Sequence, residues 1–518
     1  MIISNGEMRL FFLGLGTGRG KTTFILEHYA DFISENRANN EKILYLCNRS
    51  KLAESVRERI FNAHLENIVK VMTYQKYQDN IKESIPMESY KSYICDEAHY
   101  FLSDADFNEY TDLSYYSLLE KSNDSTVVFM TATYKDIFAL IESDYKIKYK
   151  RKILDEHKYF LPTDYSYVNS IFWYKSKKDT YAILDNILEN TDEKVIYFAN
   201  SVALQEDLYY HYLENDIPEV YNNSNIRFME FICSKNSRKD FANTIRKKYP
   251  DVLQKGEKGD YTFKNRVLIT TKLLDNGVDF KDRNIKHIIC DIRDIDSAIQ
   301  CLGRKRKQDE SDTVTFYIRD YRSNEWHQTK NNTKRKLEPA MTFVKEGKDA
   351  WVKKYGHNRN NQNAIIYPNY LTGKPAINWL SYQKGIQTLN FAENCINKTT
   401  TYKDEILEVL GDTVQGRNKT LMGIEEKERI DSIKIFANSH LNQQMAIRGN
   451  LHKRFLEIIN VKRNGKKLTS ISVINSTLET LKQPYRVISK RIRIKGKKTT
   501  MWILVSEENF ETENSLLP

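Results

Sequence analysis

Cysteines are few in this sequence, and none of them belongs to a paired motif. The six cysteines among 518 residues are scattered, without C-x-x-C spacing or a Cys/His cluster that has metal-ligand spacing. This pattern argues against a zinc module, a dithiol redox centre and a disulfide scaffold, and it favours reduced core thiols in a cytoplasmic protein. No Ser/His/Asp arrangement is evident, and residues 340–518 hold no clear nuclease set of carboxylates and lysine.

Long apolar runs and low-complexity tracts are also missing. No run approaches the length of a membrane span, and only 9 prolines occur in a chain that is 40% hydrophobic and 29% charged. Such a composition excludes a protein dominated by disorder, and the length favours about three domains. No basic stretch precedes the first apolar residues, so we expect a strand there rather than a signal peptide, and no membrane association.

Acidic residues are scarce near the C-terminus. The net charge of the chain is +11, and residues 441–518 hold 15 Lys and Arg against 6 Asp and Glu, so this stretch carries most of the excess. These basic residues lie between Arg448 and Lys498, where only Glu457 and Glu479 oppose them. A basic run can be merely a solvated face, but this imbalance favours a surface for a polyanion such as nucleic acid.

Short apolar strands alternate with helical patterns through the first two thirds of the chain. Strands expected in residues 1–160 include KILYLCN from residue 42, SYICDEAH from residue 92 and TVVFMTAT from residue 126. A second series of the same kind occupies residues 161–335. This rhythm predicts two tandem α/β domains, each with a parallel sheet that helices cover on both faces.

The rhythm ends near a polar, basic stretch at residues 327–338, and we place a domain boundary between residues 335 and 336. Residues 336–518 have a mostly helical pattern and would form an accessory domain. Near its end, SISVINSTLETLKQ is typical of an amphipathic helix, and YRVISKRIRIKGKKTTMWILV is typical of two strands around a basic turn. This order favours a winged-helix-like module; a small α+β cap with an exposed hairpin is the alternative.

A glycine-rich loop joins the first strand to the first helix in the sequence FFLGLGTGRGKTTFIL. Its glycines leave room for successive backbone N–H groups to point inward at a helix N-terminus, an arrangement that binds phosphate. The strict pattern G-x-x-x-x-G-K-[ST] is not fully met, because its first position is Leu15. Lys21 would reach the phosphates, and Thr22 would ligate Mg²⁺. The predicted nucleotide-binding residues are Thr17, Gly18, Arg19, Gly20, Lys21, Thr22 and Thr23. A purely structural turn is the alternative.

Two carboxylates follow the apolar strand in SYICDEAH. Asp96 at the strand end can hold Mg²⁺, and Glu97 can orient and deprotonate an attacking water. Strand ends in doubly wound sheets are where ligands bind. An ordinary surface pair of acids is the alternative, and the phosphate-type loop upstream makes it the weaker one.

Five motifs occur in the order of motifs I, II, III, V and VI of superfamily 2 helicases. They are TGRGKTT (17–23), DEAH (96–99), MTAT (130–133), TTKLLDNGVDF (270–280) and QCLGRKRK (300–307). The sequence from about residue 8 to 335 resembles a DExH/DEAH-type member, and its abundance of Lys, Asn, Ile and Tyr is similar to that of phage and mobile-element helicases. The resemblance implies two RecA-like domains, with ATP in the cleft between them and a nucleic-acid strand across both.

The resemblance also implies roles for residues of motifs II, III and V. His99, Thr131 and Thr133 would couple the nucleotide state to domain closure, although the threonines can also be explained as turn caps. Thr271 and Asp279 match the T-x5-G-x-D spacing of motif V. Thr271 would contact the nucleic-acid backbone, and Asp279 would lie near the nucleotide.

Motif VI would supply catalytic groups besides Glu97. Gln300 and Arg304 are four residues apart on one helix face, so both would reach toward the γ-phosphate. The family usually has a second arginine three residues after the first, and here that position is Lys307. Lysine cannot contact two oxygens as an arginine fork does, so either Lys307 acts more weakly or Arg306 takes the role in a shifted register. A solvated basic run is the alternative.

Weaker motif positions imply further contacts with the sugar-phosphate backbone. LCNRS contributes Arg49, TYQ contributes Thr73 and YFANS contributes Asn200. Side chains of these polar types make contacts that do not depend on sequence. Each position is equally compatible with a helix cap.

These features favour an ATP- and Mg²⁺-dependent helicase or translocase, on DNA rather than RNA because a winged helix suits duplex binding. The alternative is a nucleic-acid-stimulated ATPase switch that recruits a protein partner through residues 336–518. A non-enzymatic binding protein with a decayed motor is a third interpretation, and the intact Lys21, Asp96 and Glu97 argue against it.

Overall fold

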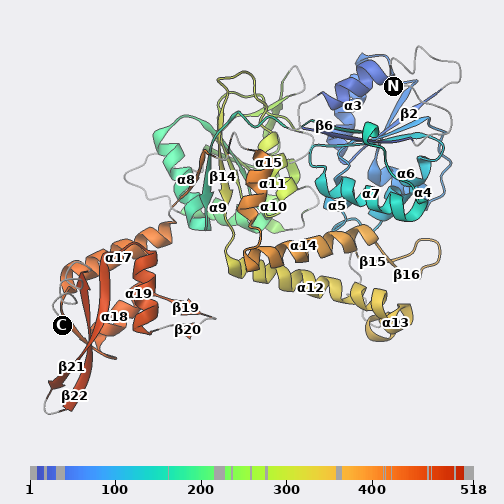
Figure 1. Ribbon diagram of the computed structural model, residues 1–518. Coiled ribbons are helices and arrows are strands. Elements are labelled where there is room, and N and C mark those ends of the chain that lie inside the picture. Colours follow the sequence, from blue (N-terminus) through green and yellow to red (C-terminus); the bar gives the residue numbers. More distant parts are fainter. Residues whose placement is uncertain are drawn as a thin grey trace. The chain divides into compact units, whose positions relative to one another are not determined.

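A computed structural model gives the structure of the chain, and contacts between residues divide it into two compact units (Figure 1). Unit 1 comprises Met1–Lys175 and Ile187–Lys419, and unit 2 comprises Ser176–Asn186 and Thr420–Pro518. The structure describes residues 9–16, 20–30, 41–161, 163–214, 228–234, 237, 239–256, 260–274, 278–356, 365–411, 414, 416–421, 423–463, 466–467, 469–494 and 497–506.

The first α/β domain of unit 1 is built on a six-stranded parallel sheet. Its strands are β1 (Leu10–Leu15), β2 (Ile43–Cys47), β3 (Val69–Thr73), β4 (Ser92–Cys95), β5 (Thr126–Thr131) and β6 (Lys158–Leu161). They lie in the order β3-β2-β4-β5-β1-β6, and every neighbouring pair is parallel. β2, β4 and β5 are buried along their whole length, as expected for parallel strands that are covered on both faces.

Side chains of β1 alternate between two apolar cores, one on each face of this sheet. Leu10 and Phe12 belong to one core, and Phe11 belongs to the other. The first core is shared with α4 (Tyr74–Lys82), α5 (Tyr100–Ser103), α6 (Thr111–Lys121) and α7 (Lys135–Tyr149). The second core is shared with α3 (Ser50–Asn62) and with the helix after the glycine loop, which consists of α1 (Lys21–Thr23) and the π-helical η1 (Phe24–Tyr29).

The second α/β domain has a seven-stranded sheet in the order β17-β7-β14-β13-β8-β12-β9. Its strands are β7 (Val168–Tyr174), β8 (Lys194–Phe198), β9 (Met229–Phe231), β12 (Val267–Thr270), β13 (Ile285–Cys290), β14 (Val314–Arg319) and β17 (Asn418–Thr420). β7, β14, β13, β8, β12 and β9 pair in parallel. The prediction of two tandem parallel-sheet domains is therefore confirmed.

Helices connect the strands of the second sheet. They are α8 (Lys177–Asn190), α9 (Val202–Glu214), α10 (Asp240–Lys248) and α11 (Ile295–Gly303). A 3-10 turn, η2 (Asp155–His157), precedes β6, and another, η4 (Lys272–Leu274), follows β12. β10 (Leu253–Lys255) pairs with β11 (Tyr261–Phe263).

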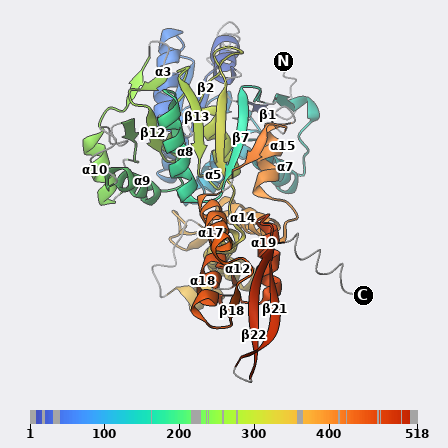
Figure 2. The same cartoon turned by 90° about the vertical axis from the view of Figure 1, so that its left-hand side faces the viewer.

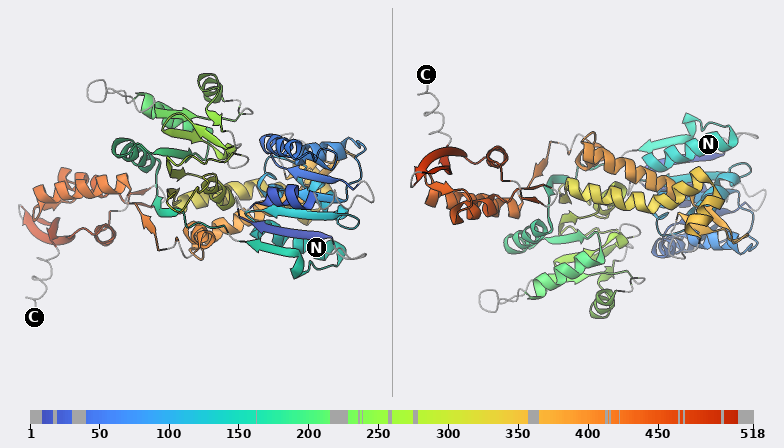
Figure 3. Two further views of the ribbon diagram at one scale, coloured as in Figure 1. Left: turned by 90° about the horizontal axis from the view of Figure 1, so that it is seen from above. Right: turned by 90° about the horizontal axis from the view of Figure 1, so that it is seen from below.

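A helical segment follows the second sheet and packs on both domains of unit 1. It comprises α12 (Ser323–Glu346), α13 (Lys348–Tyr355), β15 (Ile366–Pro368), β16 (Pro375–Ile377), α14 (Trp379–Asn397) and α15 (Tyr402–Leu410). α12 and α14 lie side by side (Figure 3). The predicted boundary at 335/336 falls inside α12, because the polar stretch at 327–338 is the solvated face of a helix. Residues 336–419 thus belong to unit 1, which differs from the predicted accessory domain of residues 336–518.

β15 contacts the first α/β domain through a buried carboxyl group. The Tyr367 hydroxyl donates a hydrogen bond to Asp112 Oδ2 at 3.2 Å, and Asp112 is 6% exposed. Among the described residues, the other oxygen of Asp112 has no hydrogen-bond partner. Burial raises the pKa of Asp112 from 3.8 to about 7.

We expect Asp112→Asn to stabilise the protein at pH 8 and not at pH 4. The pKa of Asp112 is higher in the folded state, so the folded protein retains a proton that the unfolded chain releases between these values. Its free energy of unfolding therefore falls as pH rises from about 4 to 7, by at most about 4 kcal/mol. Asparagine cannot ionise. In thermal unfolding at pH 4, 6 and 8, the melting temperature of the variant should rise relative to that of the wild type as the pH increases. An equal pH dependence in the two proteins would contradict the prediction.

Besides the part of α8 in Ser176–Asn186, the described residues of unit 2 from Thr420 onward form three helices and a small antiparallel sheet (Figure 2). Its elements are α17 (Ile424–His440), β18 (Gln444–Ala446), α18 (Asn450–Ile459), β19 (Lys462–Arg463), β20 (Lys466–Lys467), α19 (Ile471–Thr480), β21 (Tyr485–Ile494) and β22 (Lys497–Ser506). Its main sheet has the order β18-β22-β21. The predicted helix is α19 and the two predicted strands are β21 and β22, so this part of the sequence interpretation is confirmed.

The cysteines agree with the expectation of reduced core thiols. All six lie within the described residues, and each is buried and takes part in no disulfide bond there. Burial raises the pKa of the Cys47 thiol to about 12, so this group is protonated at neutral pH. Within the described residues, no helix has the length and apolarity needed to cross a membrane.

Candidate nucleotide site

The glycine loop and the acidic motif lie at one edge of the first sheet. β1 ends at Leu15, β4 ends at Cys95 and β5, which lies between these two strands, ends at Thr131. Parallel neighbours bring their carboxyl ends to the same edge, where ligands bind in sheets of this kind. Lys21, which follows β1, and Asp96, which follows β4, therefore lie at one site.

Two glycines at the end of β1 are required by packing. A Cβ atom at Gly14 would lie 2.5 Å from the ring of Phe160, and one at Gly16 would lie 2.7 Å from the Cα of Thr163. Gly20 has a φ of +76°, a left-handed conformation that favours glycine directly before α1. Three predicted loop residues lie outside the described part of the chain: Thr17, Gly18 and Arg19.

A tyrosine links the two predicted magnesium ligands. Lys21 Nζ donates to the carbonyl oxygen of Leu15 at 2.9 Å, so the amine lies over the end of β1. Thr22 Oγ1 lies 3.4 Å from the hydroxyl of Tyr45, which donates to Asp96 Oδ2 at 2.6 Å. Tyr45 is fully buried on β2. Sequence reasoning missed it, because a tyrosine inside an apolar strand has the pattern of a core residue.

Asp96 is buried and the adjacent Glu97 is partly buried, and the pKa values of the two carboxyl groups shift in opposite directions. Burial and the charge of Glu97 raise the pKa of Asp96 to about 6. Burial acts in the same direction on Glu97, but the charge of Lys21 and a hydrogen bond from His99 outweigh it and lower its pKa. Glu97 has a φ of +51°, and its backbone N–H donates to Asp96 Oδ1 at 2.9 Å. Glu97 is therefore ionised at neutral pH. A cation beside Asp96 would favour the ionised form of Asp96.

His99 connects the acidic motif with the second α/β domain. Its Nδ1 lies 3.0 Å from Thr131 Oγ1 and 3.4 Å from Glu97 Oε2. From α11, Gln300 Nε2 lies 3.0 Å from His99 Nε2 and 3.4 Å from Thr133 Oγ1. The two ring nitrogens of His99 contact groups from different domains. Five predicted site residues thus form one set of polar contacts between the two domains.

Two arginines of motif VI contact the carboxylate of Asp279, which is itself a predicted site residue. Arg304 Nη1 lies 3.3 Å and Arg306 Nη2 lies 2.8 Å from Asp279 Oδ1. α11 ends at Gly303 with Arg304 as its helical C-cap, and Lys305 then pairs with Phe280 as in a parallel sheet, with backbone hydrogen bonds of 2.8 Å from Phe280 to Arg304 and from Arg306 to Phe280. Both guanidinium groups contact the same oxygen of Asp279, so the two arginines point to the same side.

Lys307 points to the other side of this extended segment. Its Nζ lies 2.8 Å from Glu310 Oε2. Lys305, two residues earlier on the same side, is 1% exposed and pairs with Asp312 at 2.5 Å. The prediction of Lys307 rested on the family's usual position for a second arginine, three residues after the first, and this position lies beyond the end of α11. The geometry therefore favours Arg306 as the partner of the first motif VI arginine.

The residues predicted to touch nucleic acid lie at or beyond strand ends in both domains. Arg49 follows β2, and its guanidinium group pairs with both carboxylate oxygens of Asp104. Thr73 caps α4 by accepting a hydrogen bond from the backbone N–H three residues later, at 3.2 Å. Asn200 is exposed beyond β8, and Thr271 is half-buried directly after β12.

The side chains at the edge of the first sheet fit a magnesium nucleotide. Thr22 and Asp96 offer hydroxyl and carboxylate oxygens, which magnesium prefers, and Lys21 offers a cation for phosphate. The hydroxyl of Thr23 instead accepts a hydrogen bond from Arg59 at 2.9 Å. In the described parts of the chain, no three His, Cys, Asp or Glu side chains form a metal-binding group. Magnesium here would therefore complete its coordination with phosphate oxygens and water.

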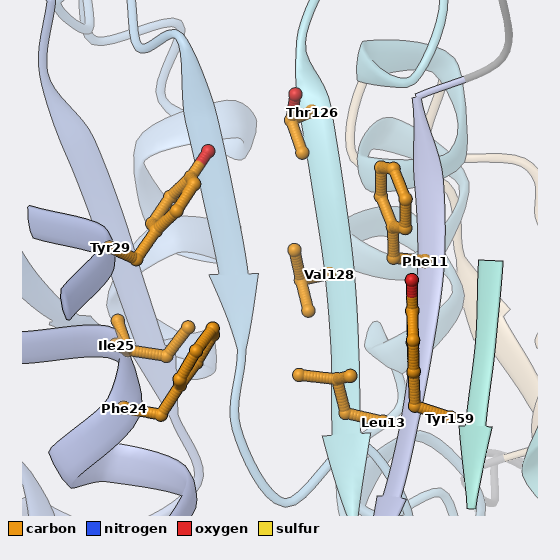
Figure 4. Close-up of a pocket in the computed structure, with 8 residues that line it drawn as sticks. All are labelled: Phe11, Leu13, Phe24, Ile25, Tyr29, Thr126, Val128 and Tyr159. Carbon is orange, nitrogen blue, oxygen red and sulfur yellow. The ribbon is translucent and has the colours of Figure 1, made fainter. Parts of the chain in front are cut away.

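An apolar cavity of about 290 Å³ lies between the first sheet and the helix that follows the glycine loop (Figure 4). It is lined by Phe11, Leu13, Phe24, Ile25, Tyr29, Thr126, Val128 and Tyr159. These lining side chains include no charged group, so a phosphate would find no cationic partner in it. This cavity therefore does not suit a phosphate group.

No protein-family model and no curated protein matches the chain. Solved structures of similar fold include Dbp5 of S. cerevisiae bound to RNA and ADP BeF3, with 14% identity and a TM-score of 0.41 over 62% of this chain and 80% of that one. The DEAD-box helicase Mss116 bound to ssRNA and UDP-BeF has 13% identity and a TM-score of 0.44 over 88% and 82%. The Mycobacterium smegmatis helicase Lhr bound to ssDNA and AMP-PNP has 12% identity and a TM-score of 0.41 over 75% and 58%. All three similarities are distant.

Proposed function

We propose that this protein is an ATP-dependent helicase or translocase of nucleic acid, of the DEAH subtype. The observation that carries the proposal is the set of contacts from Glu97 through His99 to Gln300. These contacts join a phosphate-type sheet edge in the first α/β domain to α11 of the second. ATP hydrolysis at that edge would thereby change how the two domains hold one another.

Each polar group at the site has a role in the proposed reaction. Lys21 binds the phosphates by its charge, and Glu97 orients the attacking water and accepts its proton. Arg304 and Arg306 neutralise the charge that develops on the transferred phosphoryl group. Magnesium, when bound beside Asp96, would neutralise charge on the phosphate oxygens.

The contacts between domains would couple this reaction to motion. Gln300 Nε2 lies within hydrogen-bond distance of His99 Nε2, which ties α11 to the acidic motif. After hydrolysis, the γ-phosphate no longer attracts the motif VI arginines, so the interaction that would hold the two domains closed is lost. Repeated closing and opening of the two domains would move a bound strand stepwise.

We infer further that unit 2 is a winged-helix module that binds duplex DNA. Its elements α17, β18, α18, α19, β21 and β22 follow one another in the order expected for a winged helix, with the short β19–β20 pair inserted between α18 and α19. β18 pairs with β22 only from Met501 to Ile503, so the outer part of the β21–β22 hairpin has no third strand (Figure 2). There Arg491, Arg493 and Lys498 are exposed on one face, and no ion pair with them is formed among the described residues.

Replacing these three hairpin cations with alanine is expected to weaken duplex DNA binding and its salt dependence. Each lost phosphate contact lowers the slope of log K against log salt by about 0.9, so three contacts account for a change of roughly 2 to 3. Fluorescence anisotropy with a labelled duplex at several salt concentrations measures the slope. Alanine at Lys345, Lys348 and Lys353, three lysines of unit 1, is the control. An unchanged slope in the hairpin variant would remove this assignment.

A second candidate is an ATPase switch that is stimulated by nucleic acid and recruits a protein partner without unwinding. Lys307, at the position where the resemblance expects an arginine, is the observation that favours it. Strand displacement separates the two functions, with partial duplexes of DNA or RNA that carry either a 3′ or a 5′ overhang. ATP-dependent separation of DNA duplexes supports the helicase. Hydrolysis that is stimulated by nucleic acid but separates no duplex supports the switch.

A further inference from the structure

Helix α14 is anchored in both α/β domains of unit 1. At its N-cap, the fully buried Asn378 donates to Thr111 Oγ1 at 2.9 Å and to the carbonyl oxygen of Glu109 at 3.1 Å, both in the first domain. Leu380 belongs to the apolar core of that domain, whereas Cys395, near the other end of α14, belongs to the core of the second. The helix therefore contacts both domains along its length (Figure 3).

Lys384 lies between these two anchors and contacts the start of α11. Its Nζ donates to Asp294 Oδ2 at 2.9 Å, and its side chain is 18% exposed. Asp294 is the N-cap of α11, where its other oxygen accepts a hydrogen bond from the backbone N–H of Ser297 at 3.0 Å. Burial lowers the pKa of Lys384, but the charges of Asp294 and Asp296 outweigh it, so the pKa is raised and the side chain stays cationic.

The negative charge around Lys384 comes from both domains. Asp294 and Asp296 lie at the start of α11, and Asp136 lies in the first turn of α7 in the first domain. All three carboxylates favour the charged form of Lys384. Without this cation, the carboxylates of α11 and α7 would repel one another between the two domains.

The C-terminal end of α11 carries two groups that take part in the proposed reaction. Gln300 lies on the helix, and Arg304 is its C-cap. α11 has only nine residues, so a shift at its N-terminus is carried to both groups. Small displacements of groups that must meet a reacting phosphate are costly for the rate.

We propose that Lys384 is a positioning residue for ATP hydrolysis, which holds the start of α11 against the first domain so that Gln300 and Arg304 meet the phosphate edge. The inference rests on the proposed ATPase function. It assigns a role in that reaction to a residue outside the five motifs, on a helix that contacts both domains.

The test compares kcat and KM for ATP, with stimulating nucleic acid, in the full-length wild type and its variants. Lys384→Met is expected to lower kcat on the order of tenfold, while KM for ATP changes little, because the phosphate loop is intact. Lys384→Arg keeps the charge and should restore most of kcat. Asp294→Asn keeps an N-cap acceptor but removes the paired charge, so it should resemble Lys384→Met.

Lys330→Met is the matched control. Lys330 on α12 pairs with Glu393 on α14 at 2.9 Å, so its loss removes an ion pair of the same length that also involves α14, without touching α11. We expect this variant to keep the wild-type kcat. Wild-type kcat in Lys384→Met, or an equal loss in Lys330→Met, would overturn the inference. Absence of hydrolysis in the wild type would instead refute the proposed function itself.

Discussion

Glu97→Gln is expected to lower nucleic-acid-stimulated ATP hydrolysis by about three orders of magnitude. Glutamine has the same shape as glutamate but cannot accept the proton of an attacking water. The effect should be large because the charge of Lys21 and a hydrogen bond from His99 keep Glu97 ionised despite its burial. Phosphate release measures hydrolysis, and equilibrium binding of a labelled nucleotide should remain close to wild type.

The control for this change is Glu120→Gln. Glu120 is an exposed residue at the end of α6, in the same domain and outside the nucleotide edge. It should hydrolyse ATP at the wild-type rate. If Glu97→Gln retains hydrolysis within about tenfold of wild type, Glu97 is not the general base, because such groups contribute a hundredfold or more.

Arg306→Ala is expected to lower kcat by about a thousandfold, whereas Lys307→Ala should stay close to wild type. Arginines that neutralise a transferring phosphoryl group are worth about this much. Arg306 shares the Asp279 carboxylate with Arg304, while the amine of Lys307 pairs with Glu310. Single-turnover hydrolysis with saturating nucleic acid measures the chemical step directly.

The conservative change Arg306→Lys refines this prediction. Lysine keeps the charge but cannot offer two parallel donors, so it should recover only part of the loss. A large loss in Lys307→Ala together with near-normal Arg306→Ala would show that the helical register continues beyond Gly303 during the reaction. The assignment of Arg306 would then be wrong.

The two parallel sheets and the location of the site could be predicted from local sequence. Apolar runs such as residues 126–131 are long enough for one strand each, and each is followed by a helical pattern. In such a sheet the carboxyl ends of the strands face the same edge, so the loop at Lys21 and the carboxylate of Asp96 are expected there together. The proximity of Thr131 and His99 could be predicted in the same way, because Thr131 ends β5 and His99 lies shortly after the end of β4.

Residue pairs that depend on tertiary structure could not be predicted. Tyr45 has the pattern of a core residue, and only the adjacency of β2 and β4 brings its hydroxyl to Asp96. Lys384 is 90 residues from Asp294, on a helix with no motif. The sequence left Arg306 and Lys307 as alternatives, because the choice depends on where α11 ends, and helix ends are poorly marked in sequence.

The predicted boundary at 335/336 falls inside a helix for a related reason. A polar, basic stretch is compatible with a linker, but most of residues 327–338 are solvated positions of α12, in which Trp326, Leu337, Pro339, Ala340 and Thr342 are buried. Within the stretch itself only Leu337 is buried, so the apolar period there is weak and the charged residues dominated the pattern.

Steady-state ATP hydrolysis by the wild-type protein, with and without single-stranded DNA or RNA, tests the central claim most directly. The claim is that the edge formed by Lys21, Asp96 and Glu97 hydrolyses ATP under the control of nucleic acid. We predict magnesium-dependent hydrolysis that rises when one of the polymers is added. No hydrolysis, or a rate that neither polymer changes, would contradict it.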